Sequence, residues 1–450
     1  MDLMDTPLGD EVKRIIDSKQ GTPNVYMEAT IHTLFGDVPA LKLLNYDLVR
    51  EYSTHYTDEI SLVLVVPKGQ LAYRIIPSRN ELEITLLSSA MAQHGPLDSE
   101  KRKYGTERFR AVFKEVSDPV LEANARELLS EHTMDLMDFE VVEFQLFTKA
   151  MEQFSMLSCG GSYRRTKVGD LIRTLLLQQS SKIEVDNTYK PKGIDMVEPV
   201  DAQLREHIVI PHGMRVYDMP GYVHKHCGGV YSAGLSYYYQ NDYWYVYPTF
   251  DYKRFEQASR QLNIIQVPEN KLPNLDYTYL VEGSVVNIIA TGELSLQDKS
   301  DLRKRSSGNG VRFADASRFF ENTVEVVNNK AVMSRGKLNN EYVSSQQKTE
   351  FNNLTMGTET ITANTMYQAS QLASREGVFI QLIWQNSDPS LILPGMQTRI
   401  SYYKNGRINK INAVVIGAQA SVSYEGNGLV SGRYNRSTAL LLFAANEVNQ

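Results

Sequence analysis

Three histidines and one cysteine form the group of residues in this sequence whose types best suit metal chemistry. His224, His226 and Cys227 are close together, and His212 precedes them by a short distance. Imidazole and thiolate groups are good ligands for zinc. Residues two apart do not share a helix face, however, and His224 and His226 are predicted to lie on one helix. The spacing favours packing or surface histidines, and the sequence alone does not decide whether these residues bind a metal.

No catalytic signature accompanies this group. The sequence lacks a phosphate-binding G-x-x-x-x-G-K-[ST] loop, an H-E-x-x-H zinc helix, a G-x-S-x-G nucleophile elbow and an acidic calcium loop. Gly426-Asn427-Gly428 has the wrong spacing for a nucleotide loop and is predicted to be a turn. A glycosidase needs two facing carboxylates, and no pair stands out among 53 acidic residues. We therefore expect a protein that is not an enzyme and that binds no cofactor.

Aromatic residues concentrate between residues 217 and 252. A short helical pattern there ends at Gly228-Gly229, and Asn241-Asp242 can take the positive φ angles of a tight turn. This turn joins two predicted strands, residues 230–240 and 243–247, that are rich in tyrosine. The sequence therefore predicts a short helix followed by an aromatic β-hairpin.

The aromatic hairpin suits either ordinary sheet packing or a surface shared between subunits. Tyrosine rings stack across strands while their hydroxyls stay in contact with water. Alternation puts Tyr237 and Tyr239 on one face and Tyr238 on the other, so we expect only one of these two sets to be core. The candidate oligomer interface consists of seven residues: Tyr237, Tyr238, Tyr239, Tyr243, Trp244, Tyr245 and Tyr247.

Composition is that of a soluble globular protein with room for roughly three domains. The chain has 450 residues, 42% of them hydrophobic and 22% charged, with a net charge of −6. This charge provides no general attraction to nucleic acid or to an anionic membrane. Two cysteines fit folding in a reducing cytoplasm. The acidic start lacks the features of a signal peptide, and no apolar run is long enough to span a membrane.

Most of the chain shows the alternation of β-strands. Asp118 and Pro119 predict the start of a helix in the first third. Polar segments at residues 184–203 and 328–360 are predicted to be loops or linkers, the second extended or partly mobile. The predicted strands cover residues 25–31, 38–44, 60–66, 71–76, 82–86, 109–113, 139–147, 262–267, 284–291, 378–384, 398–403, 410–422 and 437–443.

The clearest helix covers residues 166–180, with Thr166 as its cap. Its apolar residues fall at helical spacing and are expected to be buried against a β-layer. Residues 362–376 predict a further helix. The side chains expected to be buried on the helix of residues 166–180 are Val168, Leu171, Ile172, Leu175 and Leu176.

The order of these elements resembles the central baseplate hub proteins of contractile-tailed bacteriophages and the related hub part of type VI secretion spike proteins. The similar segments are residues 166–172, which open the helix, and residues 226–231, where a helix ends in glycine before a hairpin. The C-terminal stretches 393–396, 415–419 and 426–428 are similar to the closing barrel of phage hubs. The resemblance covers most of residues 20–445 and includes no catalytic signature.

The resemblance implies a mainly β fold with a few helices (α+β), in which two tube-type β-barrel domains flank inserted helix and hairpin domains. The expected N-terminal barrel comes from residues 24–147 and the C-terminal barrel from residues 378–443. The expected units are an N-terminal barrel (1–150), a helical connector (151–210), a helix-plus-hairpin α+β domain (211–325), a polar linker (326–361) and a C-terminal barrel (362–450).

The implied function is that of a late structural protein of the virion, a homotrimeric hub that joins a six-fold tail tube to a three-fold central spike. Its implied partners are tail tube, baseplate and spike proteins, with no stable membrane insertion. Assembly is expected in the host cytoplasm. Two other functions stay open: a virion adhesin or receptor-binding protein whose tyrosines stack on sugars, and a tail-associated peptidoglycan hydrolase.

Overall fold

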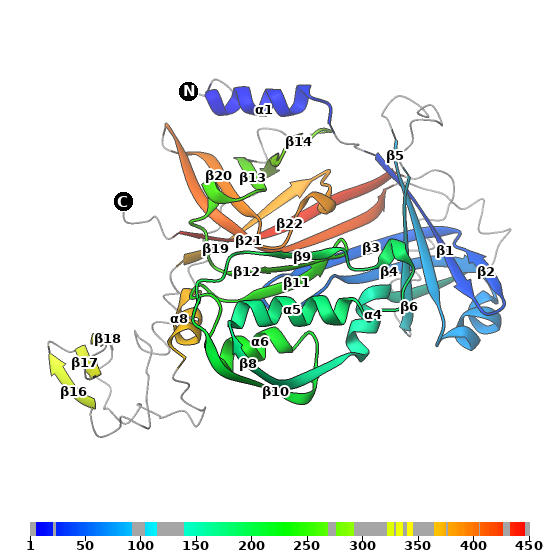
Figure 1. Ribbon diagram of the computed structural model, residues 1–450. Coiled ribbons are helices and arrows are strands. Elements are labelled where there is room, and N and C mark those ends of the chain that lie inside the picture. The colour runs from blue at the N-terminus through cyan, green and yellow to red at the C-terminus, as the bar shows by residue number, and fades with distance from the viewer. Residues whose placement is uncertain are drawn as a thin grey trace.

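The computed structural model describes residues 6–20, 24–91, 104–114, 139–268, 276–291, 322–327, 330–335, 340–344, 364–374, 377–404, 406–425 and 433–445. Its largest part is a β-sheet that closes on itself twice (Figure 1). Each closure forms a ring of strands, and the two rings share one antiparallel strand pair. The shared strands are β21 (Arg407–Glu425) and β22 (Arg433–Ala445).

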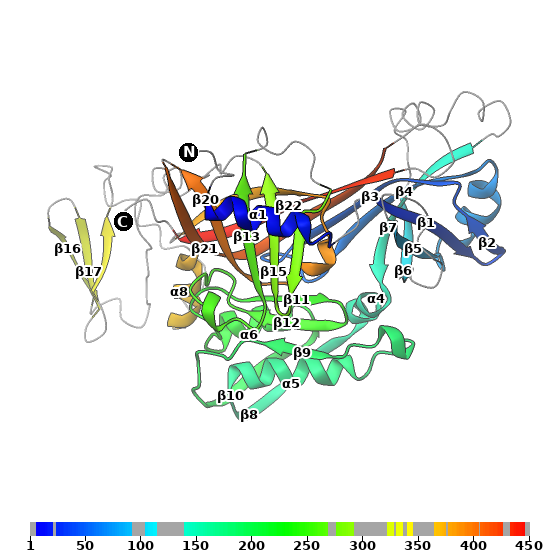
Figure 2. The same ribbon diagram turned by 90° about the horizontal axis from the view of Figure 1, so that it is seen from above.

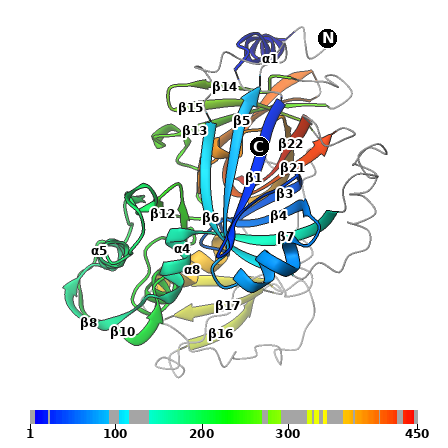
Figure 3. The same ribbon diagram turned by 90° about the vertical axis from the view of Figure 1, so that its right-hand side faces the viewer.

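The first ring is built mainly from the N-terminal third of the chain, and Figure 3 shows its strands from the side. Alternate side chains point inward and form one apolar core, as the strand period of two requires. Around the ring from β21 to β22, its other strands are β3 (Lys42–Glu51), β4 (Glu59–Pro67), β7 (Phe139–Thr148), β6 (Tyr104–Lys114), β5 (Glu83–Met91) and β1 (Asn24–Thr33). Strand β2 (Gly36–Pro39) pairs with β1 outside the ring.

The second ring joins the C-terminal strands to two strands from the middle of the chain. The two strands from the middle of the chain pair with each other in parallel, in register from Gln261↔Val285 to Val267↔Thr291. From β21 to β22 its other strands are β20 (Gln397–Lys404), β13 (Gln261–Val267), β15 (Val285–Thr291) and β19 (Gly377–Gln385). Strand β14 (Tyr279–Glu282) pairs with β15 outside the ring.

A bulge in β21 lets this strand belong to both rings. Before the bulge β21 pairs with β20, and from Gly417 onward it pairs with β3. The register against β22 shifts between Val415 and Gly417. A side chain at residue 417 would approach the Arg50 carbonyl to 3.1 Å, so glycine allows the two backbones to come close. The change of partner thus occurs where the sequence places a residue without a side chain.

The predicted mainly β fold with a few helices is confirmed. Both regions expected to form barrels contribute strands to closed rings. The second ring also takes β13 and β15 from the unit predicted at residues 211–325, and the first ring is completed by β21 and β22. Neither ring therefore coincides with one continuous stretch of sequence.

A helix that the sequence analysis missed, α1 (Pro7–Asp17), lies across the outside of the second ring (Figure 2). Leu8, Val12 and Ile15 follow helical spacing and are buried. Arg14 forms an ion pair of 2.8 Å with Glu282, but both side chains are about half exposed, so burial provides most of the attachment. The apolar residues under the helix are Ile265, Val267, Leu280 and Ile289. In the described residues, no helix has the length and apolar character to cross a membrane.

Helix α5 (Val168–Ser180) confirms the clearest helix prediction, including its five buried residues. The predicted cap is wrong: Lys167 is the N-cap, with no side-chain hydrogen bond to the helix. The helix packs against β8 (Ser158–Thr166) and β9 (Gly193–Met196). Helix α6 (Met219–His226) also packs against it, so the predicted β-layer covers its apolar face only in part.

We expect Leu175→Ala to lower the free energy of unfolding by about 2–5 kcal/mol, since the side chain is 2% exposed and truncation leaves a cavity. Urea denaturation measures this loss. Leu177→Ala is the matched control, because Leu177 lies on the same helix and is 44% exposed. Equal losses for the two variants would contradict the observed packing.

Two predictions of local structure are wrong. Residues 71–76 do not form a strand but a π-helix (Leu71–Ile75) followed by a 3-10 turn (Ile76–Ser78). Here the Glu140 carboxylate accepts hydrogen bonds from the backbone amides of Gly69 and Leu71. In a strand, such amides would instead donate to the backbone of a neighbouring strand. The predicted loop 184–203 contains β9, which pairs in parallel with the hairpin. A four-residue strand is too short to show a period.

Some predictions fall outside the described residues. The helix expected at Asp118 and the turn at Gly426-Asn427-Gly428 are among them. The polar segment 328–360 is described in part, and it contains strands that pair as an antiparallel sheet. These strands are β17 (Lys330–Arg335) and β18 (Asn340–Ser344), and β17 also pairs with β16 (Asn322–Val327), which precedes the segment.

Candidate functional site: the junction of the two rings

The predicted aromatic hairpin is present, although its first strand begins at Ser236 rather than at residue 230, and it lies between the second ring and a helical layer (Figure 1). It consists of β11 (Ser236–Gln240) and β12 (Tyr243–Tyr247), paired in register from Ser236↔Tyr247 to Gln240↔Tyr243. Asn241 and Asp242 have φ angles of 52° and 64°, as a tight hairpin turn requires. The helical layer consists of α4 (Lys149–Met156), α5 and α6 (Met219–His226) together with the paired strands β8 and β10 (Arg205–Arg215).

Both faces of this hairpin are core, contrary to the prediction that only one would be. Tyr238 and Tyr247 pack into the second ring, whereas Tyr239 and Trp244 pack into the core under the helices. All four are at most 3% exposed. Tyr237 and Tyr245 are half-buried, and Tyr243 is 38% exposed. The seven candidate interface residues are thus brought together, but four of them lie inside a single chain.

A buried ion pair marks the point where the first ring meets the hairpin. Arg50, at the end of β3, binds Asp58 with two nitrogens on one edge of its guanidinium: Nε donates to Oδ1 at 3.1 Å and Nη2 to Oδ2 at 3.0 Å. The two side chains are only 6% and 14% exposed. Burial alone would lower the pKa of Arg50, but the Asp58 carboxylate outweighs it and raises that pKa. The Arg50 guanidinium is therefore held in its charged form.

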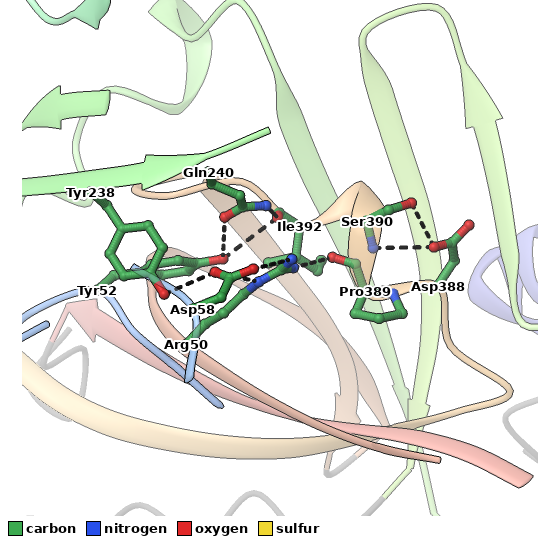
Figure 4. A network of polar contacts seen from close by, with 9 residues as sticks. All are labelled: Arg50, Tyr52, Asp58, Tyr238, Gln240, Asp388, Pro389, Ser390 and Ile392. Atoms are coloured by element: carbon green, nitrogen blue, oxygen red, sulfur yellow. Dashed lines mark hydrogen bonds and ion pairs between the residues drawn. The ribbon is translucent and has the colours of Figure 1, made fainter. Parts of the chain in front are cut away.

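Tyrosines from the hairpin and from the first ring complete this site (Figure 4). The Tyr238 hydroxyl donates to Asp58 Oδ1 at 3.0 Å, and burial followed by the Asp58 charge raises the pKa of Tyr238. The Tyr52 hydroxyl donates to Gln240 Oε1 at 3.2 Å. The Tyr52 and Tyr238 rings meet edge to face, with centroids 4.7 Å apart. Two tyrosine hydrogen bonds and one contact between aromatic side chains thus connect the hairpin to the first ring.

The second ring joins the site through backbone carbonyls. Arg50 Nη1 donates to the Pro389 carbonyl, and Gln240 Nε2 donates to the Ile392 carbonyl at 2.8 Å. These carbonyls belong to the turn that leads from β19 to β20. Side chains and carbonyls of the first ring, the hairpin and the second ring therefore meet at one place. We call this set the junction network: Arg50, Tyr52, Asp58, Tyr238 and Gln240, with the carbonyls of Pro389 and Ile392.

The junction network is suited to holding parts together, because its strong donors and acceptors are already paired. The cationic guanidinium binds the carboxylate, and the tyrosine hydroxyls bind a carboxylate and an amide. Sequence reasoning missed Arg50 and Asp58. The sequence did contain a signal for both residues, which is a charged residue at a strand position that faces the core. Arg50 follows the core residue Leu48 by two positions, and Asp58 precedes the core residue Ile60 by two.

The residues considered for metal binding have other roles. His224 is buried and uses both ring nitrogens: Nδ1 accepts from the Val230 amide at 3.0 Å, and Nε2 is 3.2 Å from Ser370 Oγ. Burial raises the pKa of the Cys227 thiol, which keeps it protonated. His212 and His226 are exposed. Within the described ranges, no three or more His, Cys, Asp or Glu side chains are placed to hold a metal ion.

We expect His224 to make the fold sensitive to mild acid. Burial lowers the pKa of His224 from 6.5 to about 4. Between these two pH values the unfolded chain binds more protons at this histidine than the folded chain does. The contribution of neutral His224 to the free energy of unfolding is therefore complete above pH 6.5 and is lost as the pH falls toward about 4. Protonation would also remove the acceptor used by the Val230 amide. Urea midpoints at pH 7 and pH 5 should differ less for His224→Asn than for the unaltered chain; equal differences would contradict this role.

Glycine ends α6 beside this histidine. Gly229 has a φ of 86°, and a Cβ there would lie 2.5 Å from the Cβ of Met366 on α8 (Thr365–Ala373). Only glycine has both the conformation and the small size that this contact needs. The predicted helix stop at Gly228-Gly229 is thus confirmed.

Comparisons with known proteins give no match in sequence and several in structure. No protein-family model matches the chain, and no curated protein matches it significantly. A tail protein from Neisseria meningitidis MC58 is similar in structure, with a TM-score of 0.40 and 10% identity, over 93% of this chain and 96% of that one. The 43 kDa tail protein of prophage MuSo2 from Shewanella oneidensis has the same TM-score and identity, over 92% and 98%.

A component of the type VI secretion system of E. coli is also similar in structure. Its TM-score is 0.37 and its identity 9%, over 93% of this chain and 77% of that one. That protein is described as structurally similar to the T4 bacteriophage tail proteins gp27 and gp5. The structural neighbours of this chain are therefore proteins of phage tails and of type VI secretion systems.

Proposed function

We propose that this chain is a structural protein of a phage tail and that three copies form the baseplate hub between a six-fold tail tube and a three-fold central spike. The observation that carries the proposal is the presence of two closed strand rings in one chain. Three copies arranged about a three-fold axis contribute six rings, which can match six subunits on one side and three on the other. Tail tube, baseplate and spike proteins are the proposed partners.

Closure of the rings supports this role physically. A closed ring pairs the edges of its strands with one another, which leaves them unable to template aggregation with other chains. The junction network holds the two rings of one chain against the hairpin, so neighbouring subunits would meet fixed surfaces. A mechanical adaptor needs such rigidity more than it needs a reactive group. We propose accordingly that the chain is assembled in the host cytoplasm, is not an enzyme and becomes part of the virion tail.

The oligomeric state tests the proposal. The chain has a mass of 51.0 kDa, so mass photometry should show particles of about 153 kDa, and imaging should show a three-fold ring with a central channel. A stable monomer or dimer at micromolar concentration would contradict it. Zymography on peptidoglycan tests the non-enzymatic part separately, because a cleared zone would identify a wall hydrolase whatever the oligomeric state.

A further inference from the structure

A pocket of about 360 Å³ lies next to the junction network, and Tyr52 is the residue of that network that lines it. It is bounded by the turn between β3 and β4, by α6, by the start of β11 and by α8. The volume is within the range of small-molecule sites. Because the walls come from the first ring, the hairpin layer and α8, a molecule bound there would touch all three.

The lining combines hydroxyl groups with aromatic rings. Ser53, Thr54 and Ser374 line the pocket, and their hydroxyls have no hydrogen-bond partner among the described residues. They can each donate and accept a hydrogen bond. Phe250 and Tyr367 supply aromatic surface on the same lining. This mixture fits a molecule that carries several hydroxyls on an apolar ring, because each kind of surface finds its counterpart.

Charge on the lining is one-sided. Lys225, at the end of α6, is half-buried, and within the described part of the chain its ammonium makes no hydrogen bond or ion pair. None of the described lining residues is an aspartate or a glutamate. His55, also on the lining, lies 3.6 and 3.7 Å from the carboxylates of Glu51 and Glu59, and its Nδ1 makes no hydrogen bond within the described part of the chain. A half-buried ammonium without a counter-charge favours a ligand with an anionic group.

We propose that this pocket binds a pyranose sugar that carries a carboxylate. The carboxylate binds the Lys225 ammonium, the sugar hydroxyls bind Ser53, Thr54 and Ser374, and the C–H groups of the ring pack against Phe250 and Tyr367. All of the lining residues belong to one chain, so the proposed binding does not depend on the oligomeric state. It gives the chain a binding activity for an acidic saccharide in addition to a structural role.

Calorimetric titration of the full chain with glucuronic acid tests the proposal. We expect saturable binding with a Kd of about 1 mM, as is usual for a single small sugar. Glucose lacks the carboxylate and acetate lacks the sugar ring, so each should bind at least about tenfold more weakly. Glucose binding as tightly as glucuronic acid would overturn the assigned charge contact. Acetate binding as tightly would overturn the sugar, and absence of saturable glucuronic acid binding would overturn the site itself.

Variants locate the binding. Lys225→Met keeps most of the side-chain length and should weaken glucuronic acid binding about tenfold while leaving the weak binding of glucose unchanged. Lys225→Arg keeps the charge and should restore most of the affinity. Lys182→Met, at an exposed lysine that does not line the pocket, is the matched control. Circular dichroism checks that each variant is folded. Unchanged affinity in folded Lys225→Met would overturn the proposed contact.

Discussion

Arg50→Met is expected to lower the free energy of unfolding by about 3–5 kcal/mol, because it leaves the Asp58 carboxylate buried without its counter-charge. The guanidinium is 6% exposed and donates to Asp58 twice and to the Pro389 carbonyl once. Its loss removes contacts to two parts of the chain at the same time. Denaturant unfolding followed by circular dichroism measures the change.

Two further variants show whether the buried charge is the cause. Arg79→Met replaces an exposed arginine and should change stability by no more than about 0.5 kcal/mol. Arg50→Met combined with Asp58→Leu removes both charges and should recover part of the loss. Recovery will be incomplete, because the Tyr238 hydroxyl loses its acceptor. If the double variant is less stable than Arg50→Met, the cost does not come from an unpaired carboxylate.

Trp244→Ala is expected to destabilise the chain by about 3–5 kcal/mol. The indole is fully buried and meets Phe154 and Tyr239 edge to face, with ring centroids 5.1 and 5.3 Å away. Its Nε1 has no hydrogen-bond partner in the described part of the chain, so Trp244→Phe should cost less than Trp244→Ala. Thermal or denaturant unfolding of the two variants measures the difference.

The neighbouring Tyr243→Ala is the matched control for Trp244, since it changes an aromatic residue on the same strand that is 38% exposed. We expect it to alter stability by about 0.5 kcal/mol. Sedimentation of the same variant tests whether the hairpin contributes to a subunit interface, because Tyr243 is the most exposed of the candidate residues. Similar losses of stability for Tyr243→Ala and Trp244→Ala would contradict the burial that the structure shows.

Local features of the fold were predictable where a short stretch of sequence contains both a regular repeat of apolar residues and a residue that ends the helix or strand. The five apolar residues of α5 repeat at helical spacing, and all five are buried. Asn241-Asp242 and Gly228-Gly229 place a turn and a helix end where the structure has them. Helix α1 had the same kind of signal, with Leu8, Val12 and Ile15 on one face, and was overlooked. The segment 71–76 misled because its short apolar run fits strand and helix equally.

The sequence by itself determined the hairpin turn, α5 and most strands of the two rings, because the period of side chains along the backbone depends only on neighbouring residues. Tertiary structure alone decided which hairpin faces are core, since burial of Tyr238 and Tyr239 requires a layer on each side. It also decided the partners of Arg50 and the closure of both rings. Arg50 and Pro389 are 339 residues apart, and no local pattern specifies a contact over such a distance.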